Sequence, residues 1–408
     1  MENLIEQSEK ELVEVYKNLD NIELVNTKKV LAAFKNHKIS EAHLNGTTGY
    51  GYGDMGREAI EGIFSEIFKA EDAIVRSQFI SGTHTISTAL FGILRPGDIV
   101  LSINGKPYDT LDEVIGIVEN KSSLKAFDVK YEQIEMKEGK FDLEKIRERV
   151  AKNDIKLIIT QRSRGYLYRD AFTIDEYQEV FKVIREVNNS AIIMVDNCYG
   201  EFVEDREPIE VGADIAVGSL IKNPGGGIAQ TGGYIVGKKE IIDIISDRYS
   251  APGLGKEGGA SFDNNRQILQ GIFMAPHTVN QSLKTAVFSA YMLEKMGYTV
   301  SPRYNDKRSD IVQMIKFEDP EKLIKFCQGI QAYSPVDSHV IPQPWDMPGY
   351  TDQVIMASGA FTAGSSIEIS CDGPIRPPYV AYLQGGLTFS SGKLAVISAI
   401  ENLGNISK

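Results

Sequence analysis

Short runs of apolar residues, many of them β-branched, alternate along the first 280 positions with stretches whose apolar residues recur at helical spacing. Unbroken apolar runs of this kind are typical of strands that are buried on both faces of a parallel sheet. The stretches at helical spacing would supply the covering helices. The expected strands are residues 73–76, 99–102, 157–160, 191–195, 215–217 and 233–237. We therefore predict a three-layer α/β sandwich with a mostly parallel sheet.

The periodicity differs at both ends of the chain. Residues 5–36 carry apolar side chains at helical spacing among many Lys and Glu residues, which predicts an amphipathic arm. After residue 280 a long helix is followed by short alternating strands and a helix over 319–331, which indicates a smaller α+β domain. A chain of 408 residues also exceeds the usual size of one hydrophobic core. We expect a helical arm at 1–48, a large α/β domain at 49–280 and a small C-terminal domain at 281–408.

Composition and charge exclude several classes of function. A net charge of −12 argues against a nucleic-acid partner, because binding phosphates requires a basic face. No segment approaches the roughly 20 apolar residues of a membrane span, and residues 1–6 lack the basic region of a signal peptide. The three cysteines, Cys198, Cys327 and Cys371, are scattered and show no metal-ligand spacing. We expect a soluble, cytoplasmic protein without a metal site.

The most informative chemistry lies where two of the predicted strands end. Val195 is followed directly by Asp196, and the apolar run at 213–218 leads through Ser219 to Lys222 and a glycine-rich turn. A lysine at the end of a core strand is well placed to form a Schiff base with pyridoxal phosphate. An aspartate at a neighbouring strand end can keep the pyridine nitrogen of that cofactor protonated. A structural interpretation stays open for both: Lys222 as a lysine with a buried stem, and Asp196 as a helix cap.

Candidate phosphate-binding residues follow the strand at 73–76. Ser81, Gly82 and Thr83 open a predicted helix, so that backbone N–H groups and the helix dipole can hold a phosphate. Ser219 could add a hydroxyl group to the same phosphate. Each of these residues alone is more often a simple helix cap or turn residue. Their combined order along the chain is far more specific than any single one.

Two residues are candidates for stacking on the cofactor ring. His84 follows the phosphate turn directly, and Tyr108 lies in the segment 105–110. An ordinary packing role is an equally good interpretation of either. We count Tyr108 with Lys222 and Asp196 among the catalytic candidates, and His84 among the cofactor-binding ones.

Taken in order, these motifs resemble those of fold-type I pyridoxal-phosphate enzymes, in particular the relatives of cystathionine and methionine gamma-lyases known as aluminium resistance proteins. The resemblance implies the aspartate aminotransferase type of fold, Lys222 as the Schiff-base lysine and Asp196 as the partner of the pyridine nitrogen. It also implies that Gly82, Thr83 and Ser219 hold the phosphate. It extends through most of the chain and is carried by residues 49–57 (GYGYGDMGR), 78–84 (QFISGTH), 195–202 (VDNCYGEF), 218–227 (GSLIKNPGGG) and 372–379 (DGPIRPPY).

The resemblance also carries an expectation about assembly. In these lyases a Tyr-x-Arg segment near the N-terminus reaches across a dimer interface to the phosphate of the neighbouring subunit. Tyr50 or Tyr52 with Arg57 stands in that region here, at a different spacing. A homodimer is then the minimal active unit, and a homotetramer is the assembly that the resemblance suggests.

One motif of the gamma-lyases is missing. Those enzymes bind the substrate carboxylate with an arginine inside a late strand, and the comparable segment here, residues 380–386, has none. Arg376 lies just upstream and is our candidate, because a guanidinium group can hold a carboxylate through two parallel hydrogen bonds. Arg162 and Arg164 are competitors, and a surface or interdomain salt bridge is an equally good interpretation of Arg376. Residues 256–263 also lack a counterpart and are expected to line the substrate pocket.

Together these features predict a carbon–sulfur lyase that acts on a sulfur-containing amino acid. Once the amino acid displaces it from the cofactor, Lys222 is the nearest general base for the Cα proton. Elimination of a β or γ thiol would then give a keto acid, ammonia and a thiol. An aminotransferase, or another pyridoxal-phosphate amino-acid enzyme such as a racemase or aldolase, would use the same Lys222 and Asp196. A protein that kept only the fold would bind no cofactor.

Overall fold

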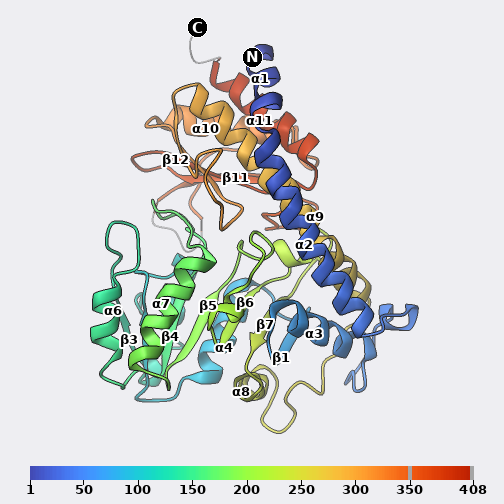
Figure 1. Cartoon of the computed structure of the whole chain (residues 1–408), viewed down its shortest axis with the longest axis vertical. Coiled ribbons are helices and arrows are strands. Elements are labelled where there is room, and N and C mark those ends of the chain that lie inside the picture. The colour runs from blue at the N-terminus through green and yellow to red at the C-terminus, as the bar shows by residue number, and fades with distance from the viewer. Residues whose placement is uncertain (348–351, 405–408) are drawn as a thin grey trace.

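A seven-stranded sheet forms the centre of the protein in the computed structural model, which describes residues 1–347 and 352–404 (Figure 1). Its strand order is β1-β7-β6-β5-β4-β2-β3, and only β7 runs antiparallel to its neighbours. The predicted three-layer sandwich with a mostly parallel sheet is therefore confirmed. The strands are β1 (Asp72–Arg76), β2 (Ile99–Ser102), β3 (Lys130–Gln133), β4 (Leu157–Gln161), β5 (Ile192–Asp196), β6 (Ile215–Ser219) and β7 (Gly233–Gly237).

Alternate residues of the central strands pack against helices on opposite faces, as the period of a strand requires. Met194 on β5 packs with α4 and α8, whereas its neighbours Ile193 and Val195 pack with α6 and α7. The apolar faces of both helix layers thus bury the unbroken apolar runs seen in the sequence. These helices are α3 (Met55–Phe68), α4 (Gly82–Ile93), α6 (Leu143–Val150), α7 (Ile174–Val187) and α8 (Lys239–Tyr249).

The edge strand β3 is the one strand of this sheet that the hydrophobic pattern did not predict. It pairs only with β2, and none of its four residues, Lys-Tyr-Glu-Gln, is buried: the two end residues are exposed and the two central ones half-buried. An edge strand with one covered side needs no apolar run, so the pattern gives no signal there.

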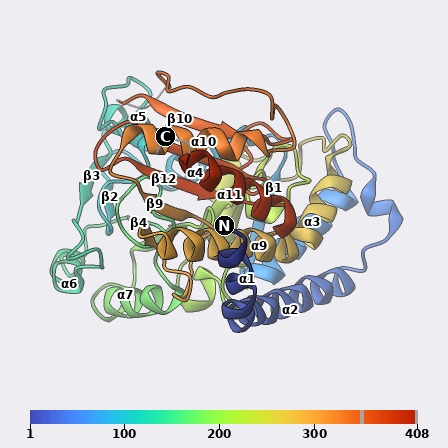
Figure 2. The ribbon, with the colours of Figure 1, turned by 90° about the horizontal axis from the view of Figure 1, so that it is seen from above.

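A second, five-stranded antiparallel sheet in the order β10-β11-β12-β9-β8 forms the small domain (Figure 2). Helices α10 and α11 cover one face, while Met314 and Tyr382 on the other face pack against Tyr166 and Tyr199 of the large sheet's loops. The predicted α+β character of this part is confirmed. Its elements are β8 (Thr299–Ser301), β9 (Gln313–Lys316), α10 (Pro320–Ala332), β10 (Val354–Ser358), β11 (Ser370–Pro374), β12 (Val380–Gln384) and α11 (Phe389–Gly404).

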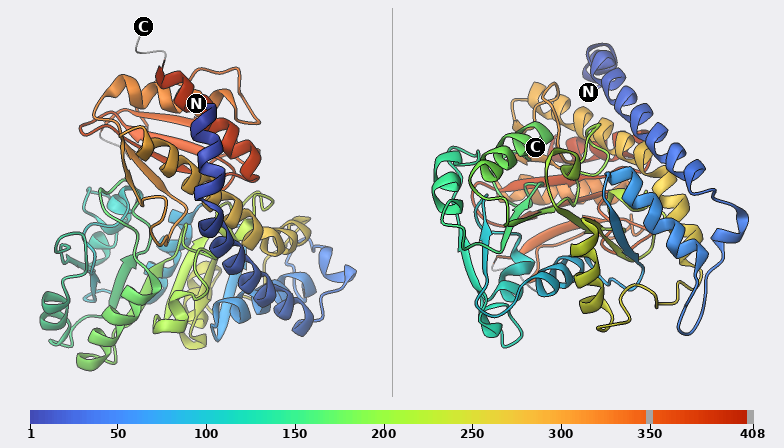
Figure 3. Two further views of the ribbon diagram at one scale, coloured as in Figure 1. Left: turned by 45° about the horizontal axis from the view of Figure 1, so that its top comes forward. Right: turned by 60° about the horizontal axis from the view of Figure 1, so that its bottom comes forward.

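The long helix α9 (Asn264–Lys295) connects the two sheets, and the N-terminal arm runs beside it (Figures 1 and 3). The arm consists of α1 (Glu2–Glu11) and α2 (Val13–Asn36), close to the predicted amphipathic segment at 5–36. The predicted domain boundary at 280 falls inside α9, and the division into domains stays a prediction. Short turns complete the fold: η1 (Glu41–Leu44), η2 (Asp109–Leu111), α5 (Asp112–Ile115), η3 (Lys125–Phe127), η4 (Pro208–Val211) and η5 (Asn223–Gly225).

One buried side chain ties the arm to the loop that follows β5. Asn26 on α2 is 1% exposed, and its amide donates hydrogen bonds of 3.1 Å to the carbonyl oxygens of both Phe202 and Glu204. The Asn26 amide thus supplies a donor to each of two loop carbonyl groups, which would destabilise the fold if they were buried without one. The arm therefore helps to position residues just after Asp196.

We expect Asn26→Ala to lower the free energy of unfolding by about 2 kcal/mol, because it leaves two loop carbonyls without donors. Urea titration of the purified variant measures this loss. Asn21→Ala, an exposed position on the same helix, is the control and should change stability far less. Equal stability of the two variants would contradict the anchoring role.

Candidate active site

Seven of the predicted site residues line one cavity at the carboxyl ends of β4, β5 and β6. Its volume is about 210 Å³. Helix α4 points its N-terminus into this cavity, which lies where open α/β sheets usually bind their ligands. The predicted residues that line it are Ser81, Gly82, Thr83, Tyr108, Asp196, Ser219 and Lys222.

One end of the cavity is suited to an anion. The Ser81 hydroxyl accepts a hydrogen bond of 3.0 Å from the amide of His84 and so caps α4. Gly82 lies close to Ser219, where an added Cβ would be 3.6 Å from the Ser219 Cβ. The Ser219 hydroxyl is buried and has no hydrogen-bond partner in the described part of the protein. Free helix N–H groups and an unpartnered hydroxyl are the donors that a phosphate takes up.

Lys222 is held at the other end by a turn that only glycine can make. Gly226 has a φ of 57°, and a Cβ there would collide with the carbonyl oxygen of Gly271 on α9. The turn therefore packs tightly on α9, and this contact fixes the backbone just after Lys222. The glycine run read from the sequence serves to position the lysine.

The Lys222 amine lies among groups that favour its charged form. Its Nζ is 4.0 Å from the centroid of the Tyr199 ring, within the range of a cation–π contact. Burial lowers the pKa of Lys222, but Tyr199, Cys198 and Asp196 more than offset this effect, so the pKa is raised overall. In the ligand-free protein the amine is therefore protonated.

Asp196 ends β5 beside this lysine, and its Oδ1 accepts a hydrogen bond of 3.1 Å from the amide of Cys198. Burial raises the pKa of Asp196, although the charge of Lys222 and the Cys198 bond act in the opposite direction. A further cation that enters the cavity would therefore lower the pKa of Asp196.

Tyr199 is a site residue that the sequence analysis did not select. Its backbone has a φ of 72°, which is rare for a tyrosine, and its hydroxyl accepts a hydrogen bond of 3.1 Å from Ser366 of the small domain. Its ring is thereby held against Lys222. The position three residues after Asp196, within the motif at 195–202, was the only signal for it.

His84 does not line the cavity. Its Nδ1 accepts a hydrogen bond of 3.3 Å from the amide of Ile80, and its ring packs edge-on against Phe79. The cofactor contact predicted for His84 is not supported, because the side chain turns back to its own loop. Tyr108 does line the cavity and is the remaining candidate for stacking.

A second cavity of about 280 Å³ adjoins the first and shares Tyr108, Gln161 and Gly165 with it. Arg376 lies on its wall, half exposed, with an ion pair of 2.9 Å to Asp352. Arg164, the other arginine on this wall, is fully buried. The Arg164 guanidinium donates to Ser301 and Asp170, so Arg376 is the arginine on this wall that is suited to a carboxylate.

Arg162 lines neither cavity. Its guanidinium group is fully buried and donates to the carboxylates of Glu204, at 2.9 Å, and Glu207, at 3.5 Å, and to the Asn197 amide oxygen. The substrate contact predicted for Arg162 is not supported, because both terminal nitrogens of its guanidinium group donate to buried partners within the chain.

Arg57 is also occupied within its own chain. Its guanidinium donates to the carbonyl oxygens of Gly51, Gly259 and Glu257 at 2.6–2.9 Å, and the residue is 3% exposed. A reach from Arg57 to the phosphate of a neighbouring subunit is therefore not supported. Two of its partners, Glu257 and Gly259, belong to the segment 256–263. This segment packs on the loop at 49–57 and lines neither cavity, contrary to the sequence expectation.

The side chains of Tyr50 and Tyr52, in contrast, are exposed. They are 79% and 60% exposed, and their rings stack on each other with centroids 5.6 Å apart. Neither ring lines the cavity of its own chain. Two exposed aromatic rings on a rigid loop are typical of a contact with another molecule.

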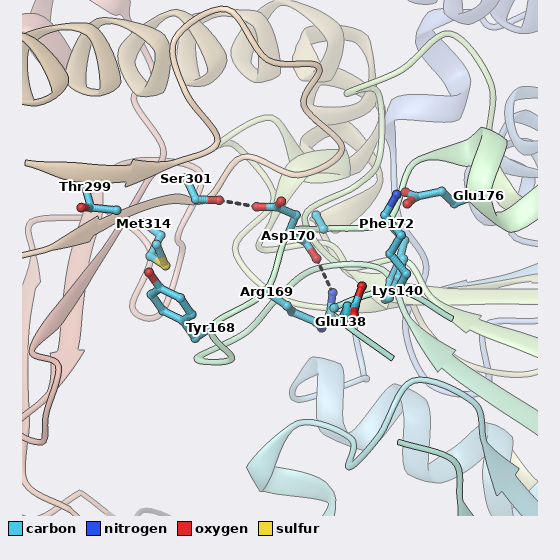
Figure 4. Close-up of a pocket in the computed structure, with 12 residues that line it drawn as sticks. Glu138, Lys140, Tyr168, Arg169, Asp170, Phe172, Glu176, Thr299, Ser301 and Met314 are labelled. Carbon is cyan, nitrogen blue, oxygen red and sulfur yellow. Dashed lines mark hydrogen bonds between the residues drawn. The ribbon is translucent and has the colours of Figure 1, made fainter. Parts of the chain in front are cut away.

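A third cavity, of about 360 Å³, lies on the far side of the segment that follows β4 (Figure 4). Arg169 on its wall is buried and donates to the carbonyl oxygens of Ser163, at 2.6 Å, and Gln161, at 3.3 Å. Burial lowers the pKa of Arg169 to about 10, so it stays charged. Neither Lys222 nor Asp196 lines this cavity. Arg169 supports the end of β4 from behind.

Comparisons with known proteins bear on this geometry. A model described as methionine gamma-lyase matches residues 1–404. The chain belongs to the methionine gamma-lyase family. A relative, the uncharacterised protein YnbB of Bacillus subtilis, is 50% identical over 398 residues, which cover 97% of this chain and 94% of YnbB. Within the described residues no cluster of His, Cys, Asp and Glu could hold a metal ion.

Solved structures place family members on the same fold. A Clostridium acetobutylicum protein, provisionally named a cystathionine beta-lyase involved in aluminium resistance, is 49% identical with a TM-score of 0.95, covering 98% of this chain and 95% of its own. A carbon–sulfur lyase involved in aluminium resistance from Clostridium novyi is 47% identical, with the same TM-score and the same coverage. The pyridoxal-5'-phosphate dependent protein YhfS of Escherichia coli shares the fold at 15% identity and a TM-score of 0.63.

The wall between the cavities and the small domain contains a titratable contact. The Tyr166 hydroxyl donates to the Asp372 carboxylate on β11, and Gln384 donates to the same carboxylate at 3.1 Å. Burial raises the pKa of Asp372 to about 6, although both hydrogen bonds oppose the change. The contact joins the two domains beside the second cavity.

We expect this carboxyl group to make the protein less stable as pH rises. A pKa near 6, above the unfolded value near 4, means that the folded state binds more protons between those values, so stability falls through that interval. Relative to the native protein, Asp372→Asn should be more stable at about pH 7.5 than at about pH 4.5, by about 2 kcal/mol. Urea titration at both pH values tests this, and an offset independent of pH would contradict it.

Proposed function

We propose that the protein is a pyridoxal-phosphate-dependent carbon–sulfur lyase that eliminates a thiol from a sulfur-containing amino acid. The observation that carries the proposal is the convergence of Lys222, Asp196 and the N-terminus of α4 on one cavity. Membership of the methionine gamma-lyase family supports the same activity. The names of the two clostridial relatives support carbon–sulfur bond cleavage.

The cavity fits the cofactor, part by part. The amides at the start of α4 and the unpartnered Ser219 hydroxyl would hold the phosphate. Lys222 would hold the aldehyde carbon, and Asp196 would pair with the pyridine nitrogen. Tyr108 would cover one face of the ring. The fit rests on Ser219 in particular, because a buried hydroxyl without a partner indicates a missing acceptor.

Each residue of the cavity then has a task in the reaction. When bound, the cofactor supplies the electron sink that stabilises a carbanion at the substrate's Cα. The Lys222 amine, once free and neutral, takes the Cα proton, and the Tyr199 ring 4.0 Å away stabilises the ammonium that results. The Asp196 carboxylate keeps the pyridine nitrogen protonated. The packed walls around Lys222 exclude water from these charges.

The second cavity would receive the substrate. Arg376 is our candidate for the substrate carboxylate, and Arg164 adds positive charge from behind the same wall. Arg376 is half exposed and would exchange Asp352 for the substrate.

A second copy of the chain would complete the site. Exposed apolar side chains on the loop at 49–57 and beside Ser81 form one candidate contact surface. In a homodimer the stacked rings of Tyr50 and Tyr52 would reach the neighbour's phosphate end, and two such dimers would form the tetramer that the resemblance suggests. No described helix is long and apolar enough to cross a membrane, and we place the enzyme in the cytoplasm. The surface consists of Tyr50, Tyr52, Met55, Ile80 and Phe262.

Lys222→Ala should remove both the visible absorbance band of lysine-bound cofactor and the release of keto acid and thiol, because it removes the attachment point and the base. A screen of cystathionine, methionine, cysteine and alanine on the purified protein measures the products. Lys121→Ala, an exposed lysine, is the control. A band that survives in Lys222→Ala would refute the assignment, and amino transfer to an added keto acid would favour an aminotransferase.

Arg376→Gln should raise KM about tenfold for every amino-acid substrate with little change in kcat, since it removes a contact made equally in the ground state and the transition state. Arg376→Lys keeps the charge but lacks the planar guanidinium group, so its KM should lie between those of the native protein and of Arg376→Gln. Steady-state kinetics measure both parameters. An unchanged KM in Arg376→Gln would assign the carboxylate to another residue.

A further inference from the structure

A buried carboxyl group packs against Gly218 of β6, the strand that leads to Lys222, and has no part in the scheme above. Glu201 is fully buried in the turn after β5, five residues beyond Asp196. Its Oε1 accepts a hydrogen bond of 2.8 Å from the Tyr234 hydroxyl, and its Oε2 has no hydrogen-bond partner in the described structure. A half-satisfied buried carboxyl is costly and calls for a reason.

The strand that leads to Lys222 is shaped around this group. Gly218 on β6 pairs with Tyr234 on β7, and a Cβ at Gly218 would collide with the Tyr234 ring and crowd the Glu201 carboxyl. Asn223, the residue after Lys222, donates a hydrogen bond of 3.0 Å from its side-chain amide to the backbone carbonyl oxygen of Glu201. The carboxyl is therefore accommodated from the segments on both sides of the lysine.

Among the charged groups around Glu201, Lys222 is the one whose charge can compensate that of the carboxylate. Neighbouring Glu207 is paired with Arg162, whereas no ion pair among the described residues includes Glu201. The titratable groups that act on or with Glu201 are Tyr234, Glu207, Cys198 and Lys222, and Lys222 is the cation among them. Burial raises the pKa of Glu201 to about 8, while Tyr234 and Lys222 oppose the rise.

We propose that Glu201 is a positioning residue for the reaction: its buried carboxylate adds to the proton affinity of the Lys222 nitrogen. The proposal rests on the proposed function. Glu201 touches neither cavity and acts only through the field that it exerts on Lys222. In its ionised form it stabilises the cationic state of that nitrogen, so the two groups titrate as a coupled pair.

The test is the pH at which the visible band of the bound cofactor changes as the Lys222 nitrogen loses its proton, recorded without substrate. Glu201→Gln has nearly the same shape but carries no charge, so this midpoint should move to lower pH by about one unit. Glu201→Asp keeps the charge, so its midpoint should lie close to that of the native protein. An unchanged midpoint in Glu201→Gln would overturn the proposal.

A second variant covers the case in which Glu201→Gln fails to fold. Tyr234→Phe leaves the carboxyl in place but removes its hydrogen bond, so the pKa of Glu201 rises and the midpoint should move in the same direction by a smaller amount. Tyr291→Phe, another fully buried tyrosine that belongs to the small-domain core, is the control and should leave it unchanged. Equal midpoints in Tyr234→Phe and Tyr291→Phe would overturn the proposal. Absence of any cofactor band in the native protein would instead contradict the proposed function.

Discussion

The structure depends on keeping one lysine amine charged at the end of a buried strand. Such a cation is expensive to desolvate unless nearby groups compensate it. Here the compensation comes from the ring of Tyr199, from Asp196 and from Cys198. Asp196 ends β5, and Cys198 and Tyr199 lie on the turn that follows it, so the pairing of β5 with β6 brings the lysine and its partners together. The cavity is a consequence of that pairing.

Rigid supports outside the cavity hold this arrangement. The turn after Lys222 packs on α9 through Gly226, and the turn after β5 is fastened to the arm through Asn26. Arg162 and its carboxylate partners form a buried network that includes Asn197, next to Asp196. Helices far apart in the sequence thus contribute to the position of two catalytic candidates.

The joint between the domains is built from the segment that follows β4. Ser163 donates to Asp310 at 2.9 Å, Tyr166 donates to Asp372, and the Tyr382 hydroxyl donates to the Tyr166 carbonyl oxygen at 2.9 Å. Tyr166 lines the cavity proposed for the substrate, and Ser163 lines the one proposed for the cofactor. Motion of the small domain would therefore change both cavities.

The sheet and the centre of the site were predictable because their signals are local. Buried strands need apolar runs, and Asp196, Ser219 and Lys222 stand directly after them. The site predictions that the structure does not support concern residues whose surroundings depend on distant partners. Arg57 and Arg162 look like ligand-binding arginines in the sequence, but carbonyls near residue 257 and carboxylates near residue 205 occupy them. Tyr199 was missed for the converse reason, since its backbone conformation and its contact with Lys222 arise only in the folded chain.

The most direct test of this account is the chemical identity of the cofactor's attachment point. Borohydride reduction of the purified protein would fix the bound cofactor to its lysine, and mass spectrometry of the peptides would locate it. The account predicts a single adduct, on the peptide that contains Lys222. An adduct on another lysine, or none on a protein that carries the cofactor, would contradict it.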